Sequence, residues 1–243
     1  MNEYLVSVDI AKKRDYTAIL TFQHAHEILD GVEALGIPDR IGTFLVVRKI
    51  ERFHNLPYQE ISDAIEYTMG NIEINNNADL LIDGTGVGAA VVDLVNARGL
   101  APIPIIFTGG QAVREVYLDM GTTWGQGGAL NRVRPLKEIH VPKLDLVDAG
   151  RLMVEQKRIK CSKSIQWADK FRQELIAFRG KVNEAGKVRF EAEGESDHDD
   201  MLVCLLMAAW FTQRTAGIDP IKERRIILDK DITGKSWEPS DNF

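Results

Sequence analysis

The sequence has few cysteines, no signal-peptide pattern and no apolar run long enough to span a membrane. Its 243 residues include only two cysteines, Cys161 and Cys204, with no CxxC pair and no Cys/His cluster. This argues against a disulfide framework or a zinc site and favours reducing, intracellular surroundings. The N-terminus lacks the layout of a signal peptide, and the longest apolar run, 201–211, is shorter than the roughly 20 residues that cross a bilayer.

A surplus of positive charge is also absent, because 36 Asp and Glu residues outnumber 30 Lys and Arg residues. The formal net charge is −6, whereas phosphate contacts normally need a surplus of lysine and arginine. The composition therefore does not announce a nucleic-acid partner, although clustered basic residues would still allow one. The chain has no GxxxxGK[ST] motif, which excludes a Walker-type phosphate loop. With 44% hydrophobic and 27% charged residues, the sequence is typical of a globular protein with a substantial core.

The first half of the chain is predicted to form β-strands first and then alternating helices and strands. Short β-rich runs and segments of helical spacing alternate there, which predicts an α/β fold with a mixed sheet: an antiparallel hairpin first, then parallel strands flanked by helices. Residues 24–40 are expected to be a loop. The predicted order is strand at 3–10, strand at 16–23, strand at 41–53, helix at 57–74, strand, glycine-rich turn and helix within 78–99, and strand at 101–110.

The second half is more varied. Residues 109–135 are rich in Gly, Thr and Arg and are expected to be irregular, as functional loops often are. A helix and a short strand are predicted within 141–159, an amphipathic helix at 162–180, a short strand at 187–194 and a closing helix at 197–214. The simplest organisation is one domain, 1–215, followed by a polar tail, 216–243.

Acidic residues stand at three structurally similar places. Asp9 ends the first strand, Asp83 ends a later one, and Asp199 and Asp200 open the closing helix. Functional groups in open α/β sheets gather at the carboxyl ends of strands, so these acids are expected to converge. Carboxylates so close together disfavour joint ionisation, and a hard divalent cation would relieve them. Two Mg²⁺ or Mn²⁺ ions about 4 Å apart would clamp the attacking and leaving oxygens of a phosphodiester.

Each acid also has a purely structural interpretation. The spacing of Ser196 and Asp199 fits a capping box, in which the serine caps the helix and the acid answers it. Asp83 stands before Gly84 and fits a turn. Asp9 is expected to be half-buried and needs a partner, which Lys12 or Lys13 could supply. The three contexts taken together favour a functional site over three separate structural roles.

Other candidates are weaker. "DGTGVG" at 83–88 is not GxGxxG, and it reads either as a tight strand-to-helix turn or as a backbone nest for a phosphate. His198 is a candidate helper in proton transfer, or a solvated residue at a helix start. Trp124 would either stack on a base or hold its loop. Basic residues that could contact DNA phosphates form two clusters: Lys12, Lys13 and Arg14, and Arg132, Arg134 and Lys137.

Several segments, in this order, resemble one known family. They are "YLVSVDIAKKRDYTAIL", "LLIDGTGVGAAVVDLV", "IFTGG", "VPKLDLVDAGRLMVEQKRIK", "WADKFRQELIAF" and "DHDDMLVCLLMAAW". Their order and spacing over residues 3–215 resemble the nuclease domain of the large terminase subunit of tailed bacteriophages. The resemblance implies an RNase H-like fold and an endonuclease that cuts concatemeric viral DNA during genome packaging. It implies Asp9, Asp83, Asp199 and Asp200 as catalytic and metal-binding residues, with two Mg²⁺ or Mn²⁺ ions.

The same resemblance implies partners and a place of action. These are double-stranded DNA, a packaging ATPase domain, the small terminase subunit and the portal, in the cytoplasm of the host bacterium. The family's ATPase carries a Walker motif and this chain has none, so motor activity is not expected of it. Asp15–Thr17 also matches the family, in what reads as a structural role.

Two rival interpretations remain from the sequence. One keeps the fold and changes the substrate: the protein would be an RNase H, which cuts RNA–DNA hybrids, or a Holliday-junction resolvase. In the other, a non-enzymatic binding module, the acids only cap helices and form turns.

Overall fold

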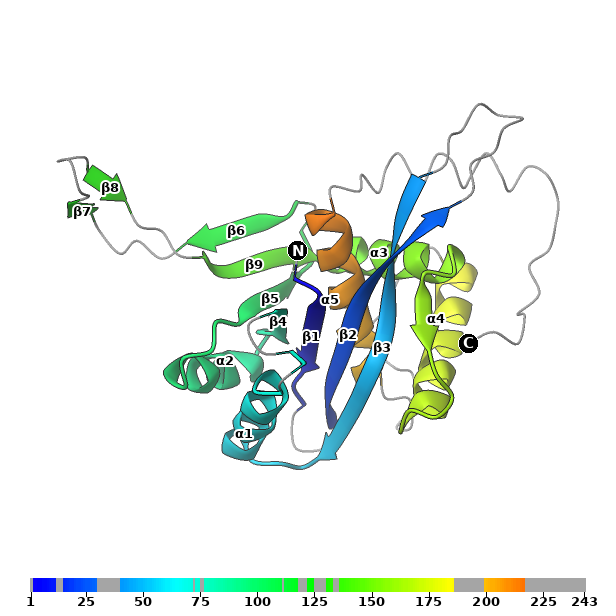
Figure 1. Cartoon of the computed structure of the whole chain (residues 1–243), viewed down its shortest axis with the longest axis horizontal. Helices are drawn as coiled ribbons and strands as arrows, with labels where there is room; N and C mark the ends of the chain where they lie inside the picture. Colours follow the sequence, from blue (N-terminus) through cyan, green and yellow to red (C-terminus); the bar gives the residue numbers. More distant parts are fainter. Residues whose placement is uncertain are drawn as a thin grey trace.

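The computed structural model describes residues 2–11, 15–29, 40–71, 73–74, 77–110, 112–117, 122–124, 130–132, 136–185 and 199–216. Within them, one eight-stranded sheet has helices packed on both of its faces (Figure 1). None of the described helices is long and apolar enough to cross a membrane.

The sheet starts as an antiparallel meander of β1 (Tyr4–Asp9), β2 (Tyr16–Leu29) and β3 (Arg40–His54). The loop predicted at 24–40 is wrong for 24–29, because β2 continues to Leu29 and pairs there with Arg40. His24 occupies an inward position in this extension. It is buried, and its Nε2 lies 3.0 Å from Thr212 Oγ1. A histidine in place of an apolar residue hid the strand from the sequence pattern.

The rest of the sheet is mainly parallel. β4 (Ala78–Asp83), β5 (Ile103–Thr108) and β9 (Leu136–Pro142) follow β1 in parallel. β10 (Ile159–Cys161) runs parallel to β3, and β6 (Arg114–Tyr117) runs antiparallel to β9. The strand order is β10-β3-β2-β1-β4-β5-β9-β6. An antiparallel start followed by parallel strands, with helices on both faces, is the predicted RNase H-like α/β fold.

Strands were missed where few side chains are apolar. Residues 109–135 were expected to be irregular, yet they hold β6, and β7 (Thr122–Trp124) pairs with β8 (Leu130–Arg132) in a separate two-stranded sheet. β9 was not predicted either. Charged residues interrupt its apolar alternation, and its place in the sheet comes from pairing with β5.

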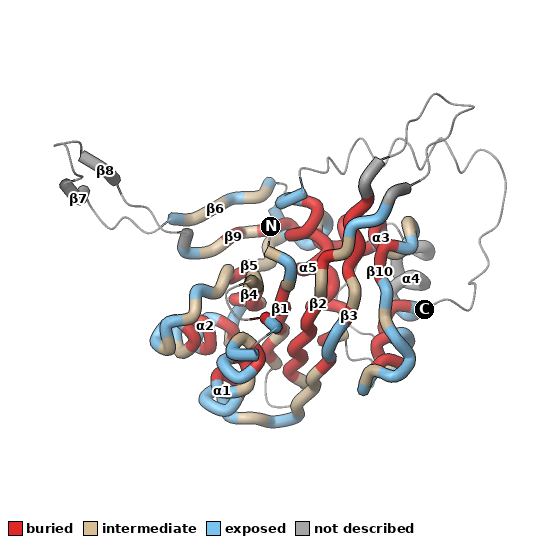
Figure 2. Tube along the Cα trace, viewed as in Figure 1, coloured by how far each residue is buried: buried red, intermediate tan, exposed pale blue. Residues whose placement is uncertain are grey.

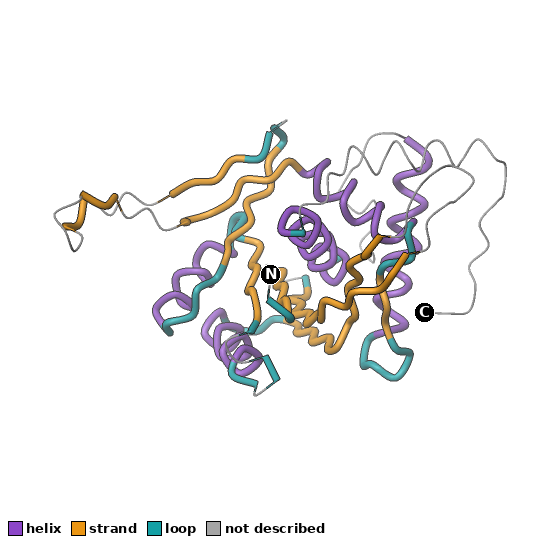
Figure 3. Tube along the Cα trace, turned by 45° about the horizontal axis from the view of Figure 1, so that its top comes forward, coloured by secondary structure: helices purple, strands orange, loops and turns teal. Residues whose placement is uncertain are grey.

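The helices divide between the two faces of the sheet. α5 (Asp200–Thr215) packs on β1 and β2, with α3 (Lys143–Glu155) and α4 (Ala168–Ala185) beside it. α1 (Tyr58–Met69) and α2 (Gly88–Ala97) pack together on the other face (Figure 3). Residues 200–213 of α5 are all buried, so this helix is the centre of the larger core (Figure 2).

Three helices differ in their bounds from the prediction. α1 spans Tyr58–Met69 rather than 57–74. α5 begins at Asp200 rather than 197, and α4 spans Ala168–Ala185 rather than 162–180. Trp167, just before α4, has a φ of 70°, which breaks the helical path there. The strand predicted at 187–194 and nearly all of the predicted tail, 217–243, lie outside the described residues.

Candidate active site

The strand register places four residues in one row across the sheet. Asp9 pairs with Ala18, and Ala18 pairs with Arg52. β4 pairs with β1 in parallel up to Ile82, so Asp83 is the next residue beside Asp9. Directly paired residues point to the same face of a sheet. Ala18 belongs to the α5-side core, so Asp83, Asp9 and Arg52 all project toward α5.

The start of α5 brings two further acids to this row. Asp199 is the N-cap residue and Asp200 the first residue of the helix, which packs on β1 and β2. Burial raises the pKa of Asp9 well above its ordinary value, and the negative charges of Asp83, Asp200 and Asp199 raise it further. The other three acids singled out in the sequence therefore lie within electrostatic reach of Asp9.

More neighbouring groups stabilise the ionised form of Asp83 than that of Asp9. Burial raises its pKa, but hydrogen bonds from Thr85, the charge of Lys143 and a hydrogen bond from the Asp9 carboxyl all act to lower it. The Thr85 N–H donates to Asp83 Oδ1 at 2.8 Å. Lys143 opens α3 directly after β9, at the same edge of the sheet. Of the Asp9–Asp83 pair, Asp9 is the acid expected to keep its proton.

The glycines after Asp83 allow the chain to turn tightly into α2. A Cβ on Gly88 would lie 1.8 Å from the carbonyl oxygen of Asp83, and one on Gly84 would lie 2.8 Å from Ile106 Cδ1. Gly86 has a φ of 65°, which favours glycine. Packing and backbone conformation thus account for all three glycines, as the tight-turn interpretation requires.

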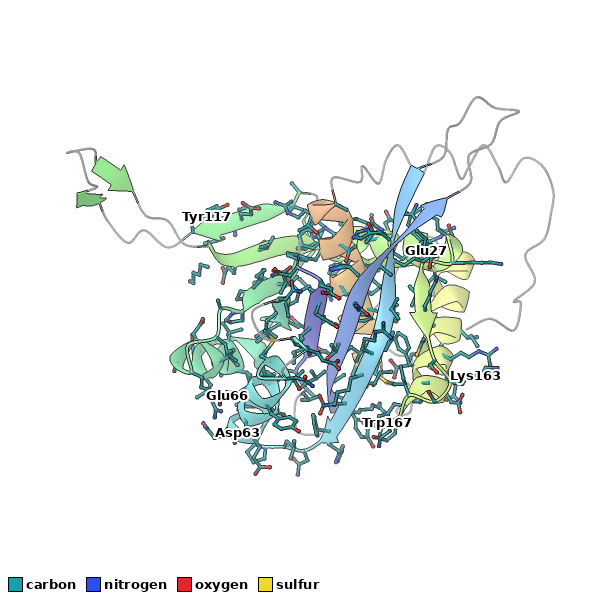
Figure 4. All side chains as sticks on the ribbon, viewed as in Figure 1. Glu27, Asp63, Glu66, Tyr117, Lys163 and Trp167 are labelled. Atoms are coloured by element: carbon teal, nitrogen blue, oxygen red, sulfur yellow. The ribbon has the colours of Figure 1, made fainter. Side chains whose placement is uncertain are left out.

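Asp200 has a different environment from the acids at the strand ends. Arg52 donates to both of its oxygens, Nε to Oδ2 and Nη2 to Oδ1, each at 2.8 Å. Both side chains are only 5% exposed. The Arg52 guanidinium also lies 3.8 Å from the centroid of the Tyr16 ring and 5.7 Å from that of Trp167. Figure 4 places Trp167 beside the end of β3 and the start of α4.

Glu174 of α4 is a fifth carboxylate at this helix start, and the sequence analysis did not single it out. Burial and the charge of Asp200 raise its pKa to about 8, although the Leu202 N–H, Arg52 and Lys170 act in the opposite direction. Its Oε2 accepts the Leu202 N–H at 3.0 Å. Glu174 thus satisfies a backbone donor in the first turn of α5.

The capping box predicted for α5 is wrong. Asp199, not Ser196, is the N-cap residue, and its side chain makes no capping hydrogen bond. The helix start is held by Glu174 and by the Arg52–Asp200 pair instead.

Of the remaining predicted site residues, Lys137, Trp124 and Arg132 lie in described strands. Lys137 is exposed near the start of β9, about five residues or roughly 17 Å from the edge where β9 ends. Trp124 lies in β7 and Arg132 in β8. Outside the described residues are Lys12, Lys13, Arg14, Arg134 and His198.

Three site residues escaped the sequence analysis. Arg52 reads as one more solvated charge in "RKIERF", and Lys143 as the polar start of a helix. For Glu174 a signal existed, because it follows Phe171 by three residues on the apolar face of α4, where a buried acid calls for an explanation.

The donor set suits a hard divalent cation, which prefers carboxylate oxygens. Asp9, Asp83 and the acids of α5 come from three separate elements, and their mutual repulsion would be relieved by such an ion. As the side chains lie, no group of three or more His, Cys, Asp or Glu residues in the described part of the chain is arranged to hold a metal. Binding would therefore require rotation of at least one carboxylate.

Fold and site together define an RNase H-like α/β protein with an acidic edge at the carboxyl ends of its central strands. The solved structures that the chain resembles include the large terminase nuclease of thermophilic phage G20c, at 15% identity and a TM-score of 0.47, over 85% of this chain and 81% of that one. The same nuclease with bound magnesium gives 16% and 0.47, over 86% and 80%.

A manganese-soaked terminase nuclease domain of human cytomegalovirus is also similar, at 10% identity and a TM-score of 0.42, over 86% of this chain and 82% of that one. A scan of protein-family models found no match, and a search of curated proteins found none either.

Proposed function

We propose that this protein is a divalent-metal-dependent DNA endonuclease. The observation that carries the proposal is the convergence of acids at one edge of the sheet: the strand register sets Asp83 beside Asp9, and the charges of both acids of α5 raise the pKa of Asp9. Simple turn and cap residues have no reason to converge from three elements. A site that binds a cation does, because the cation compensates the repulsion between the acids.

The residues have separate tasks in this proposal. Asp9, Asp83 and a carboxylate from the start of α5 would hold two Mg²⁺ or Mn²⁺ ions. When bound, such ions activate water and stabilise the charge that develops on a phosphodiester. Lys143, exposed at the same edge, would contact a DNA phosphate next to Asp83. Nothing in the described part of the chain resembles a module that reads bases, so cleavage should depend little on sequence.

The biological setting is also part of the proposal. The motif order supports cutting of concatemeric viral DNA during phage genome packaging, in the host cytoplasm. A packaging ATPase domain, the small terminase subunit and the portal would be the partners. The net charge of −6 suggests that tight DNA binding comes from such partners rather than from this chain alone. The boundary between domain 1–215 and tail 216–243 stays a prediction.

The test is cleavage of supercoiled plasmid with Mg²⁺, Mn²⁺ or EDTA. The G20c and cytomegalovirus structures contain magnesium or were soaked in manganese, so both ions belong in the assay. Wild-type protein should cut only with metal, and Asp9→Asn and Asp83→Asn should not cut. Asp93→Asn, at an exposed acid of α2, is the matched control and should cut like wild type. Equal cutting by all variants would refute the proposal.

Two further substrates decide between related activities. Preferential cleavage of an RNA–DNA hybrid or of a four-way junction would move the assignment to another RNase H-like nuclease. A chain that neither cuts DNA nor changes its melting temperature with divalent ions would be a binding module whose acids serve only the fold.

A further inference from the structure

The two adjacent acids of α5 differ in how they are held. Asp200 is 4% exposed, whereas Asp199 is only partly buried. Both oxygens of Asp200 accept hydrogen bonds from Arg52 at 2.8 Å. A bidentate arginine–carboxylate pair of this kind is among the stronger and more directional contacts in proteins. An ion that must also reach a DNA phosphate has poor access to Asp200.

Arg52 is itself fixed in place. It is in the same row of the sheet as Asp9, one strand beyond Ala18, and its guanidinium stacks on the Tyr16 ring at 3.8 Å. Removing the arginine would leave the Asp200 carboxylate buried without its partner, which is costly. Moving Asp200 away would leave the arginine in the same condition.

Glu174 completes this arrangement from α4. It is 5% exposed and accepts the Leu202 N–H at 3.0 Å, one turn into α5. Arg52 from β3 and Glu174 from α4 therefore hold the same first turn of α5, from two directions. The residue just before that turn is Asp199, whose charge acts on Asp9.

We infer that Arg52 is a positioning residue for the proposed reaction and that the two acids of α5 divide the work. Arg52 of β3 holds Asp200 and so fixes the start of α5 over the residue row that contains Asp9. Asp199, the more accessible acid, then joins Asp9 and Asp83 as the carboxylate that binds the metal. The inference rests on the proposed function, since it concerns which acid serves that site. The charge of Asp200 raises the pKa of Asp9 more than that of Asp199 does, but both oxygens of Asp200 already accept hydrogen bonds from Arg52.

The experiment is a double-mutant cycle with metal binding as a second measurement. Arg52→Gln and Asp200→Asn should each lower the melting temperature by roughly 10 °C, because each leaves a buried charge alone. The double variant should recover most of that loss, along with Mn²⁺ affinity and at least tenfold of the plasmid cleavage lost by Asp200→Asn. Asp199→Asn, at the more exposed of the two acids, should fold and lose at least about tenfold in Mn²⁺ affinity by calorimetry.

The opposite pattern overturns the inference. If the double variant folds but neither binds Mn²⁺ nor cuts, while Asp199→Asn does both, then Asp200 is the metal ligand. If the double variant does not fold, a structure of the wild-type protein soaked in Mn²⁺ decides. Manganese bound to Asp199 supports the inference, and manganese bound to Asp200 refutes it. A wild-type protein that binds no Mn²⁺ and cuts no DNA refutes the proposed function instead, whatever the melting cycle shows.

Discussion

The two ends of the residue row that crosses the sheet use buried carboxylates in opposite ways. At the Asp9–Asp83 end, acids face acids, and the pKa of Asp9 is raised by burial and by neighbouring negative charge. At the Arg52 end, Asp200 has a bidentate positive partner. Asp9 thus has mainly negative neighbours, whereas Asp200 is paired with the positive charge of Arg52. The local balance of charge separates a candidate active site from its support.

The largest expected effect is a loss of cleavage at the Asp9–Asp83 end of the row. Asp9→Asn should reduce metal-dependent plasmid cleavage by more than about a hundredfold, because metal stabilisation of the transition state is worth several kcal/mol. Its melting temperature should not fall, because the raised pKa of Asp9 already favours the neutral carboxyl, and asparagine is its neutral analogue and can still donate a hydrogen bond to Asp83. Loss of cleavage together with a fall in melting temperature similar to that of Arg52→Gln would make Asp9 a structural acid.

The second prediction concerns Glu174 and pH. Because its pKa is raised from 4.5 to about 8, the folded state binds a proton that the unfolded state has lost. The resulting stability is present below pH 4.5 and is lost as pH rises through about 8. Over that window wild type should lose on the order of a few kcal/mol more than Glu174→Gln. Denaturant melts of both variants at pH 5 and 8 measure the difference.

Glu60→Gln is the control for this measurement. Glu60 is exposed on α1, so its substitution should leave the wild-type dependence on pH unchanged. Parallel curves for wild type and Glu174→Gln would show that Glu174 ionises like an exposed acid.

The third prediction tests the Asp9–Asp83 end by adding a divalent cation. At a Mn²⁺ concentration of about 100 times the dissociation constant, binding adds about 2.7 kcal/mol, or roughly 5–10 °C in melting temperature. Wild type should show this rise and Asp83→Asn should not. The rise should be larger at pH 8 than at pH 5, because the raised pKa values of Asp9 and Asp83 mean that protons compete with the metal. A rise in both proteins would place the ion elsewhere.

The smallest expected effect separates two lysines of the same strand–helix segment. Lys143 stands at the carboxyl edge beside Asp83, and Lys137 near the other end of β9. Lys143→Ala should weaken DNA binding in EDTA and reduce the slope of log affinity against log salt by about one. Lys137→Ala should change neither quantity if DNA approaches only the carboxyl edge. Equal effects from the two lysines would mean that DNA spans the length of β9.

Much of the fold and part of the site could be read from the sequence because the relevant information is local. The apolar runs that end at Asp9 and Asp83 predicted strands, and the glycines at 84–88 predicted the turn into α2. The start of α5 was placed within three residues, at 197 instead of Asp200. β9 and the end of β2 were missed because polar residues interrupt their apolar alternation. Their structure depends on pairing with neighbouring strands.

By itself, the sequence determined that acids end two strands and open the last helix, because hydrophobic periodicity and turn residues act over a few neighbours. Only the tertiary structure decided which acids are repelled and which are paired. Arg52 and Asp200 are 148 residues apart in the chain, and they meet because strand register and helix packing bring them together. Glu174 and Lys143 acquire their roles in the same way. The sequence gives the position of each acid, but the fold determines which charged residue lies beside it.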